Sequence, residues 1–260
     1  MNQRIRCGLL LSALSILWPF AAAAQDRPFA FVSSPASWER NGALVFFEPA
    51  FADATPETVA RDGFGSRMGF EARVARRVFL VGDVSFADSA TGTSRTTFTT
   101  EALVDLLPDS TSGFHLAAGT GYRREETGAS VWIGRLVGER RLSSTRLLGD
   151  LRFERAFAAG RDSLDTIVTL AASRLLGKGF SFGAEVVGQD LEALWEPDEA
   201  EGGARVLAGP SLHWARPDHR LLATLAGGPV FRIHSNNQTS PAPRSLGNGY
   251  AVRASVGYVF

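Results

Sequence analysis

The chain has 260 residues, of which 45% are hydrophobic and 21% charged, and its 27 basic and 27 acidic side chains cancel at pH 7. That balance gives no electrostatic reason to bind nucleic acid. The one cysteine, Cys7, excludes an internal disulfide and a thiolate-rich metal site.

The first 24 residues have the three-part pattern of a secretory signal peptide. Arg4 and Arg6 precede an apolar run from about Leu9 to Phe20, and four alanines follow at 21–24. The run is shorter than the roughly 20 apolar residues that a membrane-spanning helix needs. We therefore expect residues 1–24 to be removed on export. Residues 25–41 are expected to form an irregular periplasmic lead-in, and residues 42–260 to form the folded domain.

From residue 42 onward, apolar and polar side chains alternate with a period of two residues, which predicts strand after strand. Most of the runs reach the 9 to 11 residues that a tilted strand needs to cross a bilayer, whereas strands of soluble proteins average about 5 to 6. The twelve predicted strands cover residues 42–51, 66–76, 78–88, 95–106, 113–123, 129–139, 145–157, 163–176, 179–189, 202–214, 220–233 and 249–260.

Three prolines lie inside these predicted strands, at Pro49, Pro210 and Pro229. Because proline has no backbone N–H, each one forfeits a hydrogen bond of the ladder. Glycine stands directly before Pro210 and Pro229, which predicts β-bulges there. If either of these segments is a loop, the count falls from twelve strands to ten.

The connections between the predicted strands are unequal. The three long ones, at residues 52–65, 190–201 and 234–248, are the first, ninth and eleventh in chain order. All three positions are odd, so an up-and-down arrangement places them at one end. Long loops at one end and short turns at the other are typical of outer-membrane barrels. The sequence therefore predicts an all-β fold, an up-and-down antiparallel transmembrane β-barrel.

The chain ends in "GYAVRASVGYVF", with apolar side chains at every second position up to Phe260. From about residue 42 to its end, the chain resembles the Gram-negative outer-membrane β-barrel superfamily. The last strand of that superfamily commonly ends in Phe and is recognised by the barrel-assembly machinery. The resemblance implies that Tyr258 and Phe260 form an assembly signal, and that the partners are that machinery, outer-membrane lipids and lipopolysaccharide.

The face opposite the lipid-facing one points into the lumen of such a barrel and carries charges of both signs. A twelve-stranded barrel is wider than the eight-stranded kind that side chains fill and narrower than a sixteen-stranded porin. Two passive functions fit: a narrow, weakly selective channel, or a structural component of the envelope whose lumen is closed by ion pairs. The predicted lumen-lining residues are Arg67, Glu71, Arg73, Glu101, Asp105, Arg152, Glu154, Glu185 and Arg253.

The alternative function is an outer-membrane hydrolase acting on lipid or peptide, which we favour less. His234, Ser235 and Asn236 supply residue types that such hydrolases use, but neighbours in one loop do not form a triad by adjacency. His115 and His213 share the inward parity without a patterned acidic partner. A soluble periplasmic β protein is a more distant alternative.

An acidic segment, "DLEALWEPDEAEGG" at residues 190–203, follows the ninth predicted strand. Its carboxylates are the hard oxygen ligands that calcium and magnesium prefer. The segment lacks the spacing of an EF-hand, and charge runs are more often solvated. We therefore predict no metal site and no cofactor.

Overall fold

The computed structural model describes residues 29–33, 42–53, 63–89, 94–107, 113–126, 128–157, 164–194, 204–216, 218–233 and 248–260. The predicted signal peptide and the three weak catalytic candidates, His234, Ser235 and Asn236, lie outside these residues. Among the residues described, no helix is both long and apolar enough to cross a bilayer.

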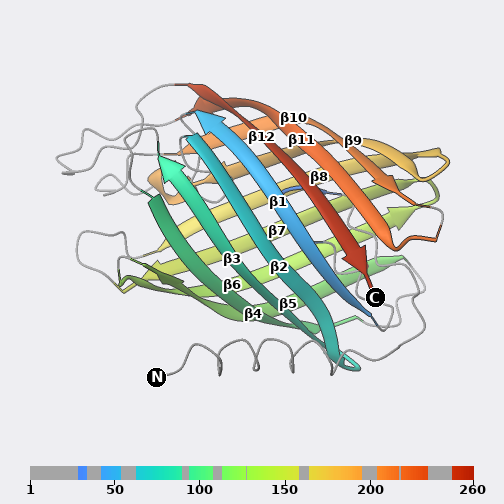
Figure 1. The fold of residues 1–260 in the computed structure, drawn as a ribbon, viewed down its shortest axis with the longest axis horizontal. Coiled ribbons are helices and arrows are strands. Elements are labelled where there is room, and N and C mark those ends of the chain that lie inside the picture. Colours follow the sequence, from blue (N-terminus) through green and yellow to red (C-terminus); the bar gives the residue numbers. More distant parts are fainter. Residues whose placement is uncertain are drawn as a thin grey trace, which may run out of the picture.

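Twelve antiparallel strands form a closed barrel in which each strand pairs with its neighbours in sequence and β1 pairs with β12 (Figure 1). This confirms the predicted all-β, up-and-down barrel and excludes the ten-strand alternative. The strands are β1 (Ala43–Asp53), β2 (Gly63–Ala75), β3 (Val78–Ser89), β4 (Ser94–Asp105), β5 (Phe114–Glu125), β6 (Ser130–Leu142), β7 (Thr145–Ala156), β8 (Asp165–Gly177), β9 (Phe180–Gln189), β10 (Arg205–Ala215), β11 (Leu221–Arg232) and β12 (Gly249–Val259).

The two ends of the barrel differ in their connections. We call the end that joins β2 to β3, β6 to β7 and β8 to β9 the short-turn end; these three hairpins each close through two residues. Lys178 and Gly179 both have positive φ, as a type I′ hairpin turn requires. The opposite, long-loop end joins β1 to β2, β9 to β10 and β11 to β12. The C-terminus lies at the short-turn end, beside the start of β1 (Figure 1).

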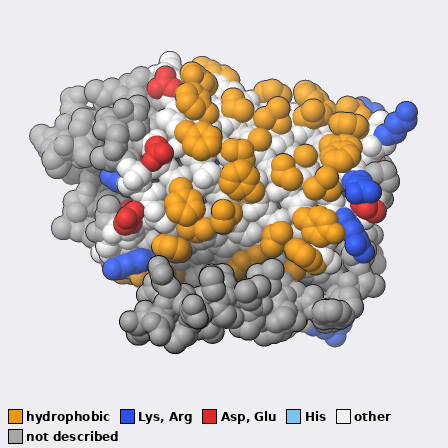
Figure 2. All heavy atoms as spheres, in the orientation of Figure 1, with side chains coloured by type: hydrophobic (Ala, Val, Ile, Leu, Met, Phe, Trp, Pro, Cys, Tyr) orange, Lys and Arg blue, Asp and Glu red, His pale blue; other side chains and the backbone are white. Residues whose placement is uncertain are grey.

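Alternation along each strand separates a lipid-facing surface from the lumen. On β4, Phe98 is 58% exposed whereas Glu101, three residues later, is 2% exposed. Hydrophobic side chains spread over the middle of the outer surface, and most of the charged side chains visible on that face lie towards its two ends (Figure 2). Such an apolar band matches the hydrocarbon layer of a bilayer.

The three prolines remain within strands, but the bulges predicted beside Pro210 and Pro229 are absent. Pairing of β10 with β11 stops after Leu207↔Val230 and resumes in the same register at Ser211↔Ala226. Pairing of β1 with β12 is likewise interrupted at Pro49 without a shift. The lost N–H therefore costs ladder bonds locally while the register is kept. Register shifts occur instead between Arg73 and Ala75 and between Leu175 and Gly177, beside short turns.

Candidate functional site in the barrel lumen

A network of ion pairs lines the lumen wall and joins β4, β6 and β7. Arg135 holds Asp150 through two guanidinium nitrogens, with Nη2 to Oδ2 at 2.7 Å and Nε to Oδ1 at 3.1 Å. Its Nη1 reaches Glu101 Oε2 at 3.2 Å. All three side chains are buried. Buried charges are tolerated only when they are paired and hydrogen-bonded, and this arrangement meets that condition.

The same network continues towards β5. Arg152 donates to Glu101 Oε1 at 2.7 Å and lies 3.5 Å from Glu154 Oε1. Arg123 contacts Glu154 Oε2 at 2.9 Å. Glu101 is therefore shared by two arginines, Arg135 and Arg152, and Glu154 by two, Arg123 and Arg152. Side chains from four strands are thereby linked into one network of alternating positive and negative charges.

A second group of charges joins β1, β2 and β3. Arg67 on β2 reaches Asp83 Oδ2 at 2.8 Å and Glu48 Oε2 at 3.5 Å. Its guanidinium also lies 5.3 Å from the ring centroid of Phe46. Glu48 was not among the lumen residues predicted from sequence, although it has the same parity on β1 as the inward-facing Phe46 and Ala50.

A short stretch of chain that precedes β1, Phe29–Ser33, occupies the lumen itself. The backbone nitrogens of Ala30 and Phe31 donate to the two carboxylate oxygens of Glu185 on β9, each at 2.9 Å. Arg253 on β12 donates to the carbonyl oxygen of Ala30 at 3.3 Å, and its guanidinium lies 5.0 Å from the centre of the Phe31 ring. We call Phe29–Ser33 the luminal segment.

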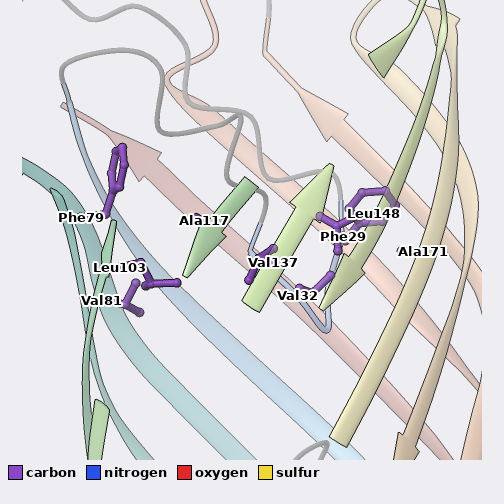
Figure 3. Packing of buried hydrophobic residues seen from close by; sticks show 9 residues of the cluster. All are labelled: Phe29, Val32, Phe79, Val81, Leu103, Ala117, Val137, Leu148 and Ala171. Atoms are coloured by element: carbon purple, nitrogen blue, oxygen red, sulfur yellow. The ribbon is translucent and has the colours of Figure 1, made fainter. Parts of the chain in front are cut away.

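The luminal segment also fills an apolar part of the interior. Phe29 and Val32 pack with inward-facing residues of β3 to β8 (Figure 3). Phe31 packs against a second cluster on β1 and β8 to β12. Nothing in the alternation of the strands reveals this packing. The signal in the sequence is the apolar stretch "FAFV" at residues 29–32, which a solvated lead-in does not need. The members of the first cluster are Phe29, Val32, Phe79, Val81, Leu103, Ala117, Val137, Leu148 and Ala171.

Two cavities border the ion-pair networks and the luminal segment in the part of the chain that the structure describes. The larger, of about 130 Å³, lies towards the long-loop end; we call it the long-loop cavity. The smaller, of about 50 Å³, is bounded by Phe31, Val32 and Ser33. Arg67, Arg152 and Arg253 line both cavities and therefore lie between them. The larger cavity is bordered by five arginines and four carboxylates, namely Arg67, Arg95, Arg123, Arg152, Arg253, Glu48, Asp83, Glu101 and Glu125.

The nine predicted lumen residues fall into three places. Arg67, Glu101, Arg152 and Glu154 belong to the ion-pair networks described above. Glu71, Glu185 and Arg253 contact the luminal segment, and Ser33 Oγ donates to Glu71 Oε1 at 2.7 Å. The other two lie near the short-turn end. Arg73 donates to the carbonyl oxygens of Ala75 and Arg76, and Asp105 accepts from the backbone N–H of Leu107.

The predicted assembly-signal residues lie on the outer surface at the short-turn end. Tyr258 and Phe260 are 41% and 44% exposed, and their rings meet edge to face with centroids 5.1 Å apart. Phe260 continues the seam, because its backbone nitrogen donates to the carbonyl oxygen of Ala43 at 2.9 Å. Their role as a signal stays a prediction.

Two inward-facing histidines, His115 and His213, lie near the short-turn end. Both His115 and His213 are buried, and His213 Nδ1 lies 3.1 Å from the hydroxyl of Thr224 on β11. A nucleophile needs a base placed within hydrogen-bond reach, and a catalytic role for either ring would require such a partner facing a cavity. Neither histidine borders either of the two cavities described above.

Three buried carboxylates gather at the long-loop end, where β9 runs into a short 3₁₀ helix, η2 (Leu191–Leu194). Asp165, Asp190 and Glu192 bring oxygens within 4.8 Å of one another. Thr166 N donates to Glu192 Oε2 at 2.6 Å, and burial raises the pKa of Glu192 to about 7, with the charge of Asp190 adding to the effect. These oxygens are the group best placed, among the described residues, to hold a hard cation.

Comparison with known proteins defines the fold and no more than the fold. No protein-family model matches the sequence, and no curated protein is similar to it. Among solved structures, the KdgM porin in complex with disordered oligogalacturonate is similar at 14% identity and a TM-score of 0.57, over 84% of this chain and 99% of that one. The NanC porin is similar at 7% identity and a TM-score of 0.58, over 82% and 98%. The chain therefore has a porin-like outer-membrane barrel fold.

Proposed function

We propose that this barrel is a narrow, weakly selective channel for small hydrophilic solutes in the outer membrane of a Gram-negative bacterium. The observation that carries the proposal is the long-loop cavity, a polar space inside a closed barrel of porin-like fold. Its volume of about 130 Å³ is enough for several water molecules. The proposal includes export through the predicted signal peptide, insertion by the barrel-assembly machinery, and contact with lipid and lipopolysaccharide.

Weak selectivity follows from the charges on the wall of the cavity. Five arginines and four carboxylates leave little net charge to favour one sign of ion. A ring of one sign would instead select ions of the opposite sign. Solutes that carry hydrogen-bonding groups and little net charge are the best match for a wall on which donors and acceptors alternate.

A second passive function, a structural element of the envelope, is supported by one observation. The luminal segment and the ion pairs of Arg135 fill the barrel between the two ends. If that filling is permanent, the barrel conducts nothing and serves by its presence in the membrane. The two proposals differ in a measurable property, the conductance of the purified barrel.

The test is a recording from purified full-length protein in planar lipid bilayers. We expect discrete openings, and a reversal potential close to zero in a tenfold gradient of potassium chloride. A reversal potential close to the Nernst value of either ion would contradict weak selectivity. The structural element would be favoured if folded, inserted protein shows no openings. This must hold both for the full chain and for the variant with Phe29→Ser, Phe31→Ser and Val32→Ser that is described below.

A further inference from the structure

The luminal segment is bound as a ligand is bound, at a site built from side chains of the barrel wall. The peptide unit between Ala30 and Phe31 is gripped from both sides. Its N–H donates to Glu185, and its C=O accepts from Arg253. Glu185 takes a second hydrogen bond from the N–H of Ala30, so one carboxylate serves two consecutive amides.

Burial makes this grip specific. Glu185 is 0% exposed and Arg253 is 6% exposed, so both charged side chains are buried. A hydrogen bond to a charged group is stronger than one between neutral groups, and a buried carboxylate without donors is costly. The amides of the luminal segment supply donors to Glu185. The barrel wall therefore carries a buried carboxylate, Glu185, whose hydrogen bonds are supplied by a peptide backbone.

The apolar side chains of the segment are also held by the barrel wall. Phe31 packs against the apolar cluster on β1 and β8 to β12, and Phe29 and Val32 pack towards the short-turn end.

We infer that the lumen holds a peptide-binding site, formed by Glu185, Arg253 and Glu71, whose ligand is the chain's own luminal segment, and that the barrel conducts when this segment leaves. The inference rests on the proposed channel function and adds its regulation. Phe29 and Val32 pack in the short-turn half of the barrel and Phe31 packs in the long-loop half, so the apolar side chains of the segment occupy the interior between the two ends. In the seated state the conductance is low.

The segment can leave without being threaded through the barrel. β1 starts at the short-turn end, and nine residues separate Ser33 from Ala43. An extended chain covers about 3.3 to 3.6 Å per residue, so nine residues reach about 30 Å, roughly the thickness of the hydrocarbon layer. Movement out of the short-turn end therefore needs no break in the strands.

The first experiment removes the contacts of the segment in the full-length chain. In a variant carrying Phe29→Ser, Phe31→Ser and Val32→Ser, we expect the open probability in planar bilayers to rise several-fold over that of the parent. Glu185→Gln should raise it as well, because the substitution replaces a doubly accepting carboxylate by an amide. Glu139→Gln is the matched control: Glu139 is buried and inward-facing but bonds Arg141, and we expect parental behaviour.

The second experiment supplies the ligand from outside. A synthetic peptide of residues 26–35, added at the short-turn side of the triple variant, should block its openings. The same peptide with serine at positions 29 and 31 should not. Block by both peptides or by neither would overturn a specific site for the luminal segment.

The third experiment keeps the segment in place. The chain beyond the predicted signal peptide has no cysteine, so Ser33→Cys and Glu71→Cys can be joined selectively by a short bifunctional thiol reagent. We expect the crosslinked barrel to stay closed and the uncrosslinked barrel to open. Equal opening of the two forms overturns the inference, and this test holds even if the triple variant fails to fold.

These results separate the two proposals. If the parent conducts as well as the triple variant, the channel stands and the plug is overturned. If both are folded, as judged by heat-modifiable migration on a gel, inserted and silent, the channel itself is overturned.

Discussion

Arg135 on β6 and Asp150 on β7 form a two-pronged ion pair inside the barrel, with the shorter contact at 2.7 Å. Because Arg135 also reaches Glu101 on β4, one guanidinium bonds two buried carboxylates from strands on either side of its own. Arg135 therefore links β6 both to the adjacent β7 and, over β5, to the non-adjacent β4.

Removal of Arg135 should be far more costly than removal of Asp150. Arg135→Met leaves Asp150 without its principal partner and Glu101 with Arg152 alone, and the loss of one partner of a buried pair typically costs about 3–5 kcal/mol. Asp150→Asn leaves Arg135 bonded to Glu101, so we expect a smaller loss. The free energy of unfolding can be measured by urea titration in lipid vesicles. A double variant, Arg135→Met with Asp150→Asn, should recover part of the loss; an additive double variant would contradict coupling.

Glycine at position 209 is required by close packing of β10 against β11. A Cβ there would collide with the carbonyl oxygen of Gly227 and lie 2.8 Å from the Cα of Gly228. Overpacking of this kind costs roughly 1–3 kcal/mol, so Gly209→Ala should lower the urea midpoint. Gly149→Ala is the control, because its Cβ would meet only Leu170 Cδ2 at 3.7 Å. Equal effects of the two substitutions would contradict this account.

The docking of η2 at the long-loop end should weaken as the pH rises. Burial raises the pKa of Glu192 from 4.5 to about 7, so the docked state binds a proton more tightly than the undocked state. The stability gained from the proton is complete below pH about 4.5 and is lost progressively up to pH about 7. Hydrogen exchange of residues 190–194, corrected for intrinsic rates, should therefore quicken between pH 5 and 7. Glu192→Gln should remove this dependence; its persistence would assign the effect to another group.

Antibody access tests the orientation of the barrel. Epitope tags inserted near Asp198 and Asn237 lie in connections at the long-loop end, and tags at Arg76 and Pro217 lie in connections at the short-turn end. In intact cells we expect only the first pair to be labelled. Labelling of both pairs, or of the second alone, would contradict an outward-facing long-loop end.

Deletion of Phe260 tests the predicted assembly signal. The residue is half exposed to lipid at the end of β12, so its loss from a finished barrel should cost no more than about 3 kcal/mol. Assembled yield in cells should fall by more than the refolding yield in detergent. Equal, modest losses in the two assays would leave Phe260 as an ordinary packing residue.

The barrel was predictable because its strands obey a strict period of two, and the predicted and observed strands agree within three residues at every boundary. The inward residues Arg67, Glu101 and Arg152 followed from the same parity. What could not be predicted was which charges meet. Glu101 on β4 reaches Arg135 on β6 and Arg152 on β7 along the lumen wall because of the tilt and relative register of the strands, which sequence spacing does not specify. The luminal segment was missed because its contact with Glu185 joins residues about 155 positions apart.

Closure of the barrel joins Leu44 to Val259, residues 215 positions apart. All the other pairings join strands that follow one another in the chain. Pairing of distant residues carries a larger loop-closure entropy and slows folding. We therefore expect the β1–β12 seam to form last and to set the rate at which the barrel matures. The luminal segment precedes β1 in the chain. We therefore expect the segment to be close to the lumen when β1 pairs with β12 and the barrel closes.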